Sequence, residues 1–314
     1  PEASMHISKC FNQFKRLEKI TTQENTQVLL TTHWYGSLPT IQKGNLHHLS
    51  IGEKPVIKTF DFLNYLEDRR EFPDDIEMKS FFELVTTIIS SVKNDNTNWL
   101  ICEGSDDKLY LQHYLNEQIE NLHILPVGGI GNVIKLYEYL YVPFKEKIEK
   151  KLLKNAKVFC LIDSDTDQKT IKLPSQIDKH LFIKRLQLES DNTFSLKNLE
   201  NTGLYSPTVF EDCLLPDIFK TALNKTIETE FSDEKKELYN NFTFNSACLN
   251  TRLSGENTLL EPKHIDFLKR KEELYEEFKK NSFKYNLSIN YTNTCNKENT
   301  PEVINKIITL YNNV

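Results

Sequence analysis

The chain has 314 residues, with 39 Lys and Arg against 45 Asp and Glu, and a formal net charge of −6. With 39% hydrophobic residues, the composition is that of a globular protein and excludes wholesale disorder and a collagen-like structure. No apolar run approaches the ~20 residues of a membrane span, and no signal peptide is visible. Taken alone, the acidic excess argues against nucleic-acid binding. Six cysteines without a CxxC pair predict free thiols in a reducing cytoplasm rather than disulfides or a zinc site.

The front of the chain contains alternating helix and strand patterns. Apolar residues recur at three- and four-residue spacing over 5–20, which predicts a helix. Short β-rich runs predict strands at 26–32 and 45–51. The patterns at 60–67 and 76–92 turn helical again, and the second of these is amphipathic.

A polar run at 94–98 is the most natural domain boundary, because the pattern changes after it. Short apolar strands now alternate with helices, which predicts an α/β fold with a parallel sheet covered on both faces. The strands are predicted at 99–102, 122–127, 157–162 and 179–188. The helices are predicted at 106–118, 132–142 (ending at Pro143), 145–154, 208–225, 262–280 and 301–311.

Acidic residues follow two of these strands at the point where each strand ends. Glu103 follows the first strand, Asp163 and Asp165 follow the third, and Asp167 lies close enough to join them. The carboxyl ends of parallel strands share one edge of a sheet, so these carboxylates are expected to meet there. Such a cluster repels itself and calls for cations, and hard oxygen ligands select Mg²⁺ or Mn²⁺. The pattern therefore predicts a metal site for phosphoryl transfer or phosphodiester hydrolysis.

A glycine turn follows the second strand and should lie at the same edge. Gly128, Gly129 and Gly131 would let backbone N–H groups approach a phosphate at a helix N-terminus. A tight turn from strand to helix is the alternative explanation of these glycines.

Three runs of the sequence together resemble a TOPRIM domain, in the version found in the OLD family of nucleases. They are LICEGSDDK at 100–108, LPVGGIGN at 125–132 and VFCLIDSD at 158–165. The resemblance implies that Glu103, Asp163 and Asp165 hold divalent metals, two ions in all.

Two more site residues follow from the same resemblance. The run VFEDCL at 209–214 resembles the segment whose acidic residue serves the second metal, and Glu211 matches better than its neighbour Asp212. An acid in an ordinary first helical turn is the alternative. The family also places a late lysine near the scissile phosphate, for which Lys284 is the candidate and Lys269 the rival.

The first residues resemble the tail of an ABC-type ATPase of the recombination-repair class. PEASMH at 1–6 is followed by VLLTTH at 28–33, and His33 would be the switch histidine that senses the γ-phosphate in the intact protein. No GxxxxGK[ST] motif is present, so the chain is expected not to hydrolyse ATP alone. We expect the C-terminal portion of an OLD protein, with domains at 1–58 (ATPase remnant), 59–97 (helical linker) and 98–314 (TOPRIM nuclease domain with C-terminal helical elements).

The resemblance implies a metal-dependent DNA endonuclease or nickase that is regulated by an ATPase. Such proteins often serve anti-phage defence, including systems encoded beside retrons. The expected partners are DNA, further copies of the chain through the ATPase, and a protein or nucleic acid of the defence system, but no membrane. Two alternatives remain. One is a module that binds DNA ends or a partner without cutting, and the other is a topoisomerase-like enzyme, which would need a nucleophilic tyrosine in a partner domain.

Overall fold

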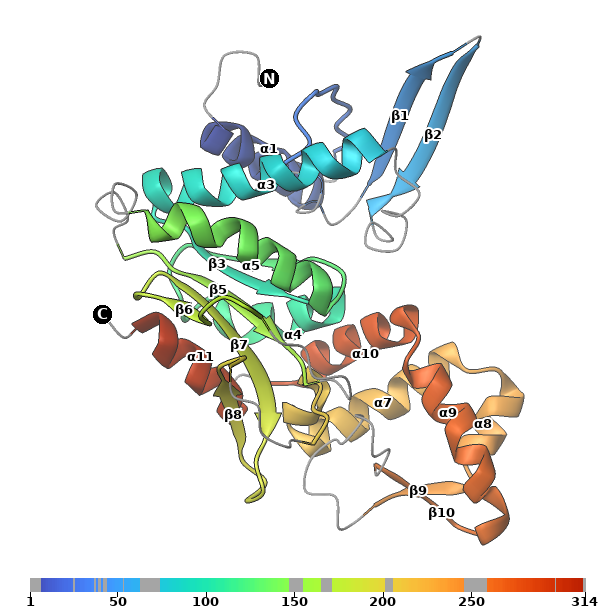
Figure 1. Cartoon of the computed structure of the whole chain (residues 1–314). Coiled ribbons are helices and arrows are strands. Elements are labelled where there is room, and N and C mark those ends of the chain that lie inside the picture. The colour runs from blue at the N-terminus through green and yellow to red at the C-terminus, as the bar shows by residue number, and fades with distance from the viewer. Residues whose placement is uncertain are drawn as a thin grey trace.

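A mostly parallel sheet forms the centre of the computed structural model (Figure 1). The structure describes residues 7–24, 26–36, 38, 41, 44–52, 54–62, 74–146, 155–164, 171–200, 206–245, 259–296 and 298–312. Within these ranges the central sheet has six strands: β3 (Asn98–Cys102), β4 (Leu122–Pro126), β5 (Val158–Ile162), β6 (Gln176–Ile177), β7 (Leu181–Leu188) and β8 (Phe194–Lys197).

The order of the strands is β4-β3-β5-β7-β6, and β8 also pairs with β7. Neighbours among β4, β3, β5 and β7 are parallel, while β6 and β8 run antiparallel to β7. The prediction of a mixed α/β fold with a largely parallel sheet is therefore confirmed. The two short antiparallel strands were not predicted.

Helices cover both faces of this sheet, as the apolar strands predicted. One face carries α1 (Ile7–Gln23), α3 (Asp74–Asp95) and α5 (Ile130–Lys145). The other face carries α4 (Ser105–Leu115), α7 (Pro216–Glu230), α10 (Asn281–Thr294) and α11 (Glu302–Asn312). Strand β3 contributes side chains to the hydrophobic core on each face of the sheet. Trp99 and Ile101 are buried in the core beside α1, α3 and α5, and Leu100 and Cys102 are buried in the core on the other face.

The remaining described elements are not strands of this sheet or helices on its two faces. They are the hairpin of β1 (Asn45–Ile51) and β2 (Pro55–Asp61), the 3₁₀ helices η4 (Phe210–Cys213) and η5 (Ile265–Arg270), the helices α8 (Asp233–Tyr239) and α9 (Lys271–Phe278), and the strands β9 (Phe242–Phe244) and β10 (Leu260–Pro262).

Two predictions for the front of the chain were wrong. Residues 26–32 form no strand, because none of the described strands pairs with them and β propensity alone does not make a strand. Residues 60–61 belong to β2 instead of a helix, since Phe60 pairs with Leu46 across the hairpin. The rest of that predicted helix, 63–67, lies outside the described residues.

Some predicted helices differ in where they end or in whether they are continuous. Helix α5 continues through Pro143 to Lys145, because the proline stands in the last turn and interrupts little of the hydrogen-bond ladder. The predicted helix at 208–225 is divided into η4 and α7, because Pro216 begins a new helix. The predicted helix at 262–280 is divided into η5 and α9. Of the predicted helix at 145–154, residues 147–154 lie outside the described part of the chain.

The front of the chain shares a hydrophobic core with the sheet. The ring of Phe11 on α1 lies 5.3 Å from that of Trp99 on β3 and 5.1 Å from that of His123 on β4, centroid to centroid. The predicted boundary between 58 and 59 falls within β2, and the predicted linker at 59–97 contains α3.

Five cysteines are buried free thiols, namely Cys10, Cys102, Cys160, Cys213 and Cys295. The sixth cysteine, Cys248, lies outside the described residues. None of the helices that the structure describes is long and apolar enough to cross a bilayer.

Candidate metal centre

The ends of β3 and β5 bring together two of the predicted carboxylates. These strands are parallel neighbours, with Ile101 opposite Cys160, so Glu103 and Asp163 follow them at the same edge. The backbone N–H of Asp163 donates to Oε1 of Glu103 at 2.8 Å. Burial raises the pKa of Asp163 well above its usual range, and the negative charges of Asp107 and Glu103 raise it further.

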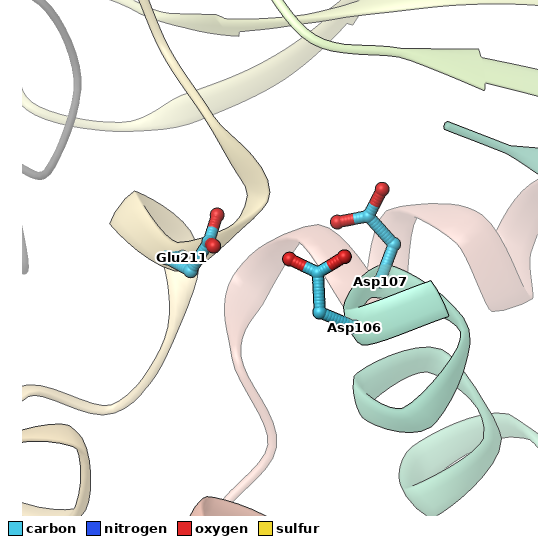
Figure 2. A group of neighbouring side chains, drawn as sticks. All are labelled: Asp106, Asp107 and Glu211. Atoms are coloured by element: carbon cyan, nitrogen blue, oxygen red, sulfur yellow. The ribbon is translucent and has the colours of Figure 1, made fainter. Parts of the chain in front are cut away.

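Two further carboxylates, which sequence reasoning missed, join this edge from the first turn of α4. Oxygen atoms of Asp106, Asp107 and Glu211 all lie within 4.8 Å of one another. Figure 2 shows the two aspartates rising from α4 toward Glu211 on η4. The side chain of Asp106 is 13% exposed, while Asp107 and Glu211 are 7% and 1% exposed as whole residues. Both aspartates belong to the run LICEGSDDK, where acids in a first helical turn had an ordinary explanation in the helix dipole.

The pKa values of these two aspartates are shifted in the direction expected for a buried cluster of like charges. Burial raises the pKa of Asp106 to about 6, and the charge of Glu211 is the next cause. Burial also raises the pKa of Asp107 well above its usual range, followed by the charges of Asp106 and Glu211. Without a cation, the cluster therefore favours protonated carboxyl groups at mildly acidic pH.

Gly104 leaves room for the Asp106 carboxylate in the first turn of α4. Its N–H donates to Oδ2 of Asp107 at 2.9 Å. A Cβ atom at this position would lie 2.1 Å from Oδ1 of Asp106, which is closer than any real contact. The glycine is thus required by the position of the Asp106 carboxylate.

We expect Gly104→Ala to weaken Mn²⁺ binding about tenfold, because the new methyl group displaces the Asp106 carboxylate. Isothermal titration with MnCl₂ measures this change. Gly131→Ala is the matched control, since an added Cβ there meets nothing within 4 Å. Equal affinities for both variants would contradict the requirement for glycine at 104.

A short backbone bridge places Glu211 beside Asp163. The N–H of Ser164 donates to the carbonyl of Thr208 at 2.8 Å, and the N–H of Thr208 donates to the carbonyl of Ser164 at 2.9 Å. The chain then enters η4, where Oδ2 of Asp212 accepts the N–H of Val209 at 3.1 Å. Asp212 therefore caps this turn, while Glu211 faces the cluster.

Lys284 on α10 supplies a positive charge to the same cluster. Its Nζ lies 3.1 Å from Oε1 of Glu211 and 3.9 Å from Oδ2 of Asp106. The charge of Glu211 is the main cause that raises the pKa of Lys284. The rival Lys269 is exposed on η5, where its neighbour Arg270 forms an ion pair with Glu273 at 3.0 Å.

The glycine turn joins β4 to α5 and contacts the backbone of Glu103. The N–H groups of Gly128 and Gly129 donate to the backbone carbonyl of Glu103 at 2.8 and 3.2 Å. Their φ angles of 77° and 96° lie in the region that favours glycine. Two of the predicted phosphate-binding donors are thus used in the turn, while Gly131 lies in the first turn of α5. Phosphate binding by these glycines stays a prediction.

Three of the predicted site residues remain to be placed. Asp165 and Asp167 lie outside the described residues. His33 lies in the segment between α1 and β1, and its role in sensing a nucleotide stays a prediction.

The described donor set contains only oxygen atoms of carboxylates, and it gathers from segments far apart in the sequence. Such donors suit a hard divalent cation, so the cluster could hold a metal ion. No family model matches the chain, and none of the curated proteins or solved structures matches it.

Proposed function

We propose that the chain is a Mg²⁺-dependent DNA endonuclease or nickase whose catalytic part is a TOPRIM domain of the OLD family. One observation carries the proposal: carboxylates from the end of β3, the end of β5, the start of α4 and η4 converge with one lysine. These segments include parts of two of the three runs on which the resemblance rests, at 100–108 and 158–165.

The residues fit the proposed metal. Glu103, Asp106, Asp107, Asp163 and Glu211 would hold it, with Asp165 and Asp167 as further candidates from the sequence. Two ions are proposed, as the resemblance implies. When bound, Mg²⁺ or Mn²⁺ would supply Lewis acidity toward phosphate oxygens and neutralise developing charge.

The side chains of the cluster have separate tasks in this proposal. The carboxylates would bind the cation, and Asp106, which is protonated below its raised pKa of about 6, would release that proton when the cation binds. Lys284, whose side chain is 28% exposed, would offset negative charge on the phosphate. We propose that an ATPase regulates this site, that copies of the chain associate through that ATPase, and that the protein acts in anti-phage defence.

The test is nicking of supercoiled plasmid DNA by the chain, supplied with ATP and with Mg²⁺, Mn²⁺ or EDTA. Open-circular DNA should appear with either metal and not with EDTA. Lys269→Met is the matched control for Lys284→Met, because only Lys284 contacts the cluster. Absence of metal-dependent nicking by the wild-type chain would contradict the proposal.

One observation favours a second candidate, a module that binds DNA ends or a partner without cutting. The ion pair between Lys284 and Glu211 already places a positively charged ammonium group among the carboxylates, so part of their charge is balanced without a metal ion. A non-cutting module would bind DNA ends equally well in EDTA and in Mg²⁺, and Asp163→Ala would leave that binding unchanged. Fluorescence anisotropy with a labelled duplex distinguishes this outcome from the nuclease.

A further inference from the structure

The hydroxyl group of Tyr291 lies where the elements that carry the acidic cluster meet. Its oxygen accepts the backbone N–H of Leu215 at 3.1 Å and lies 2.8 Å from the hydroxyl of Tyr114. Tyr291 belongs to α10, Tyr114 belongs to α4, and Leu215 lies between η4 and α7. One hydroxyl group thus joins three separate elements by directional bonds.

Each of these elements also carries part of the cluster. Tyr291 follows Lys284 by two helical turns, and Tyr114 follows Asp107 by two turns, so each pair shares one face of its helix. Leu215 follows η4, which carries Glu211. The spacing of the charged side chains therefore depends on how α4, α10 and η4 are held together.

The hydrogen bonds around Tyr291 form a short chain. The thiol of Cys295 donates to the carbonyl of Asn296 at 3.1 Å, and its sulfur also lies 3.1 Å from the hydroxyl oxygen of Tyr114. The hydroxyls of Tyr114 and Tyr291 share a hydrogen bond in which either can donate, and the oxygen of Tyr291 accepts the N–H of Leu215. Bonds in such a chain strengthen one another.

The place where Tyr291 meets Tyr114 and Leu215 is buried, so its polar groups need hydrogen-bond partners within the protein. Tyr291 has no exposed surface, and burial raises its pKa to about 12, so the hydroxyl keeps its proton at neutral pH. The ring of Tyr110 lies 5.4 Å from that of Tyr291 and 6.0 Å from that of Phe210, and fills the space between α10 and η4. Removal of the hydroxyl would leave the Leu215 N–H without its partner and leave the elements held by apolar contacts, which have no preferred direction.

We propose that Tyr291 is a positioning residue of the metal centre, whose hydroxyl fixes Glu211 and Lys284 at their distance from Asp106 and Asp107. The inference rests on the proposed function in one respect, namely that this cluster binds a divalent cation. A metal site requires its ligands to be placed within about 0.5 Å, and a directional bond between their supporting elements provides that precision.

Isothermal titration of the full chain with MnCl₂ tests this role without any measurement of activity. We expect Tyr291→Phe to raise the Kd for Mn²⁺ about tenfold, as the loss of outer support does at other metal sites. Tyr114→Phe leaves the bond from Leu215 in place, so its effect should be smaller. Tyr239→Phe is the matched control, because its hydroxyl joins α8 to Asn224 on α7 at 2.7 Å, and its Kd should equal that of the wild type.

Thermal unfolding by circular dichroism accompanies each titration and separates positioning from stability. A Tyr291→Phe variant that melts earlier but keeps the wild-type Kd would overturn the inference and leave the metal centre standing. A wild-type chain that binds no Mn²⁺ would overturn the metal centre and this inference with it. If Tyr291→Phe does not fold, the test uses Tyr114→Phe instead. An unchanged Kd for Mn²⁺ in that variant overturns the inference.

Discussion

Glutamine in place of Glu211 is expected to lower metal-dependent nicking of DNA about 100-fold. The substitution keeps the size of the side chain but removes its negative charge. That charge lies 3.1 Å from Nζ of Lys284, and a Glu211 oxygen lies within 4.8 Å of oxygen atoms of Asp106 and Asp107. Initial rates of plasmid nicking at saturating Mg²⁺ measure the loss. Titration with MnCl₂ should show weaker binding in parallel, because one ligand has lost its charge.

Asp212→Asn is the control for this substitution. Asp212 is the next residue and is equally buried, but its carboxylate accepts the N–H of Val209 and so caps η4. We expect this variant to be less stable by about 1 kcal/mol while its nicking rate stays within a few-fold of the wild type. Equal losses of nicking in both variants would contradict the assignment of Glu211, rather than Asp212, to the metal centre.

The metal-free protein is expected to lose stability as the pH rises through the range in which Asp106 titrates. Its pKa is raised from 3.8 to about 6, so the folded state holds a proton that the unfolded chain has released. The folded state then binds more protons, and the free energy of unfolding falls as the pH rises from about 4 to about 6. The raised pKa of Asp106 corresponds to a fall of about 3 kcal/mol in the free energy of unfolding.

Urea unfolding in EDTA at several pH values from about 4 to about 7 measures this effect, with Asp106→Asn as the comparison. The difference in free energy of unfolding between the variant and the wild type should grow with pH through that window. The buried imidazole of His123, whose pKa is lowered by burial, acts in the opposite direction and cancels in the difference. Parallel curves for the two proteins would contradict the raised pKa. Mn²⁺ at pH 7 should restore stability to the wild type by binding the folded state.

Part of the cluster could be predicted from local pattern alone. Glu103 and Asp163 follow strands that are apolar throughout, and parallel neighbours place their carboxyl ends at one edge. No local pattern gives the position of Glu211, because it depends on the bridge between Ser164 and Thr208 and on the turn that Asp212 caps. The resemblance alone pointed to Glu211 and to Lys284 on α10.

The missed residues had an ordinary local explanation. Asp106 and Asp107 lie in the first turn of a helix, where the dipole favours acids with or without a ligand. Only the tertiary structure shows that Glu211 faces them. The same limit applies to the fold, since residues 26–32 have the composition of a strand but none of the described strands pairs with them.

The contact between α1 and the sheet joins the front of the chain and the sheet in one hydrophobic core. Phe11 and Phe14 belong to the same core as Trp99 and Ile101, and Glu103 follows that strand directly. A fragment that began at residue 98 would lose α1 and α3 and keep only α5 of the described helices on that face, so part of the core around Trp99 would be exposed to water.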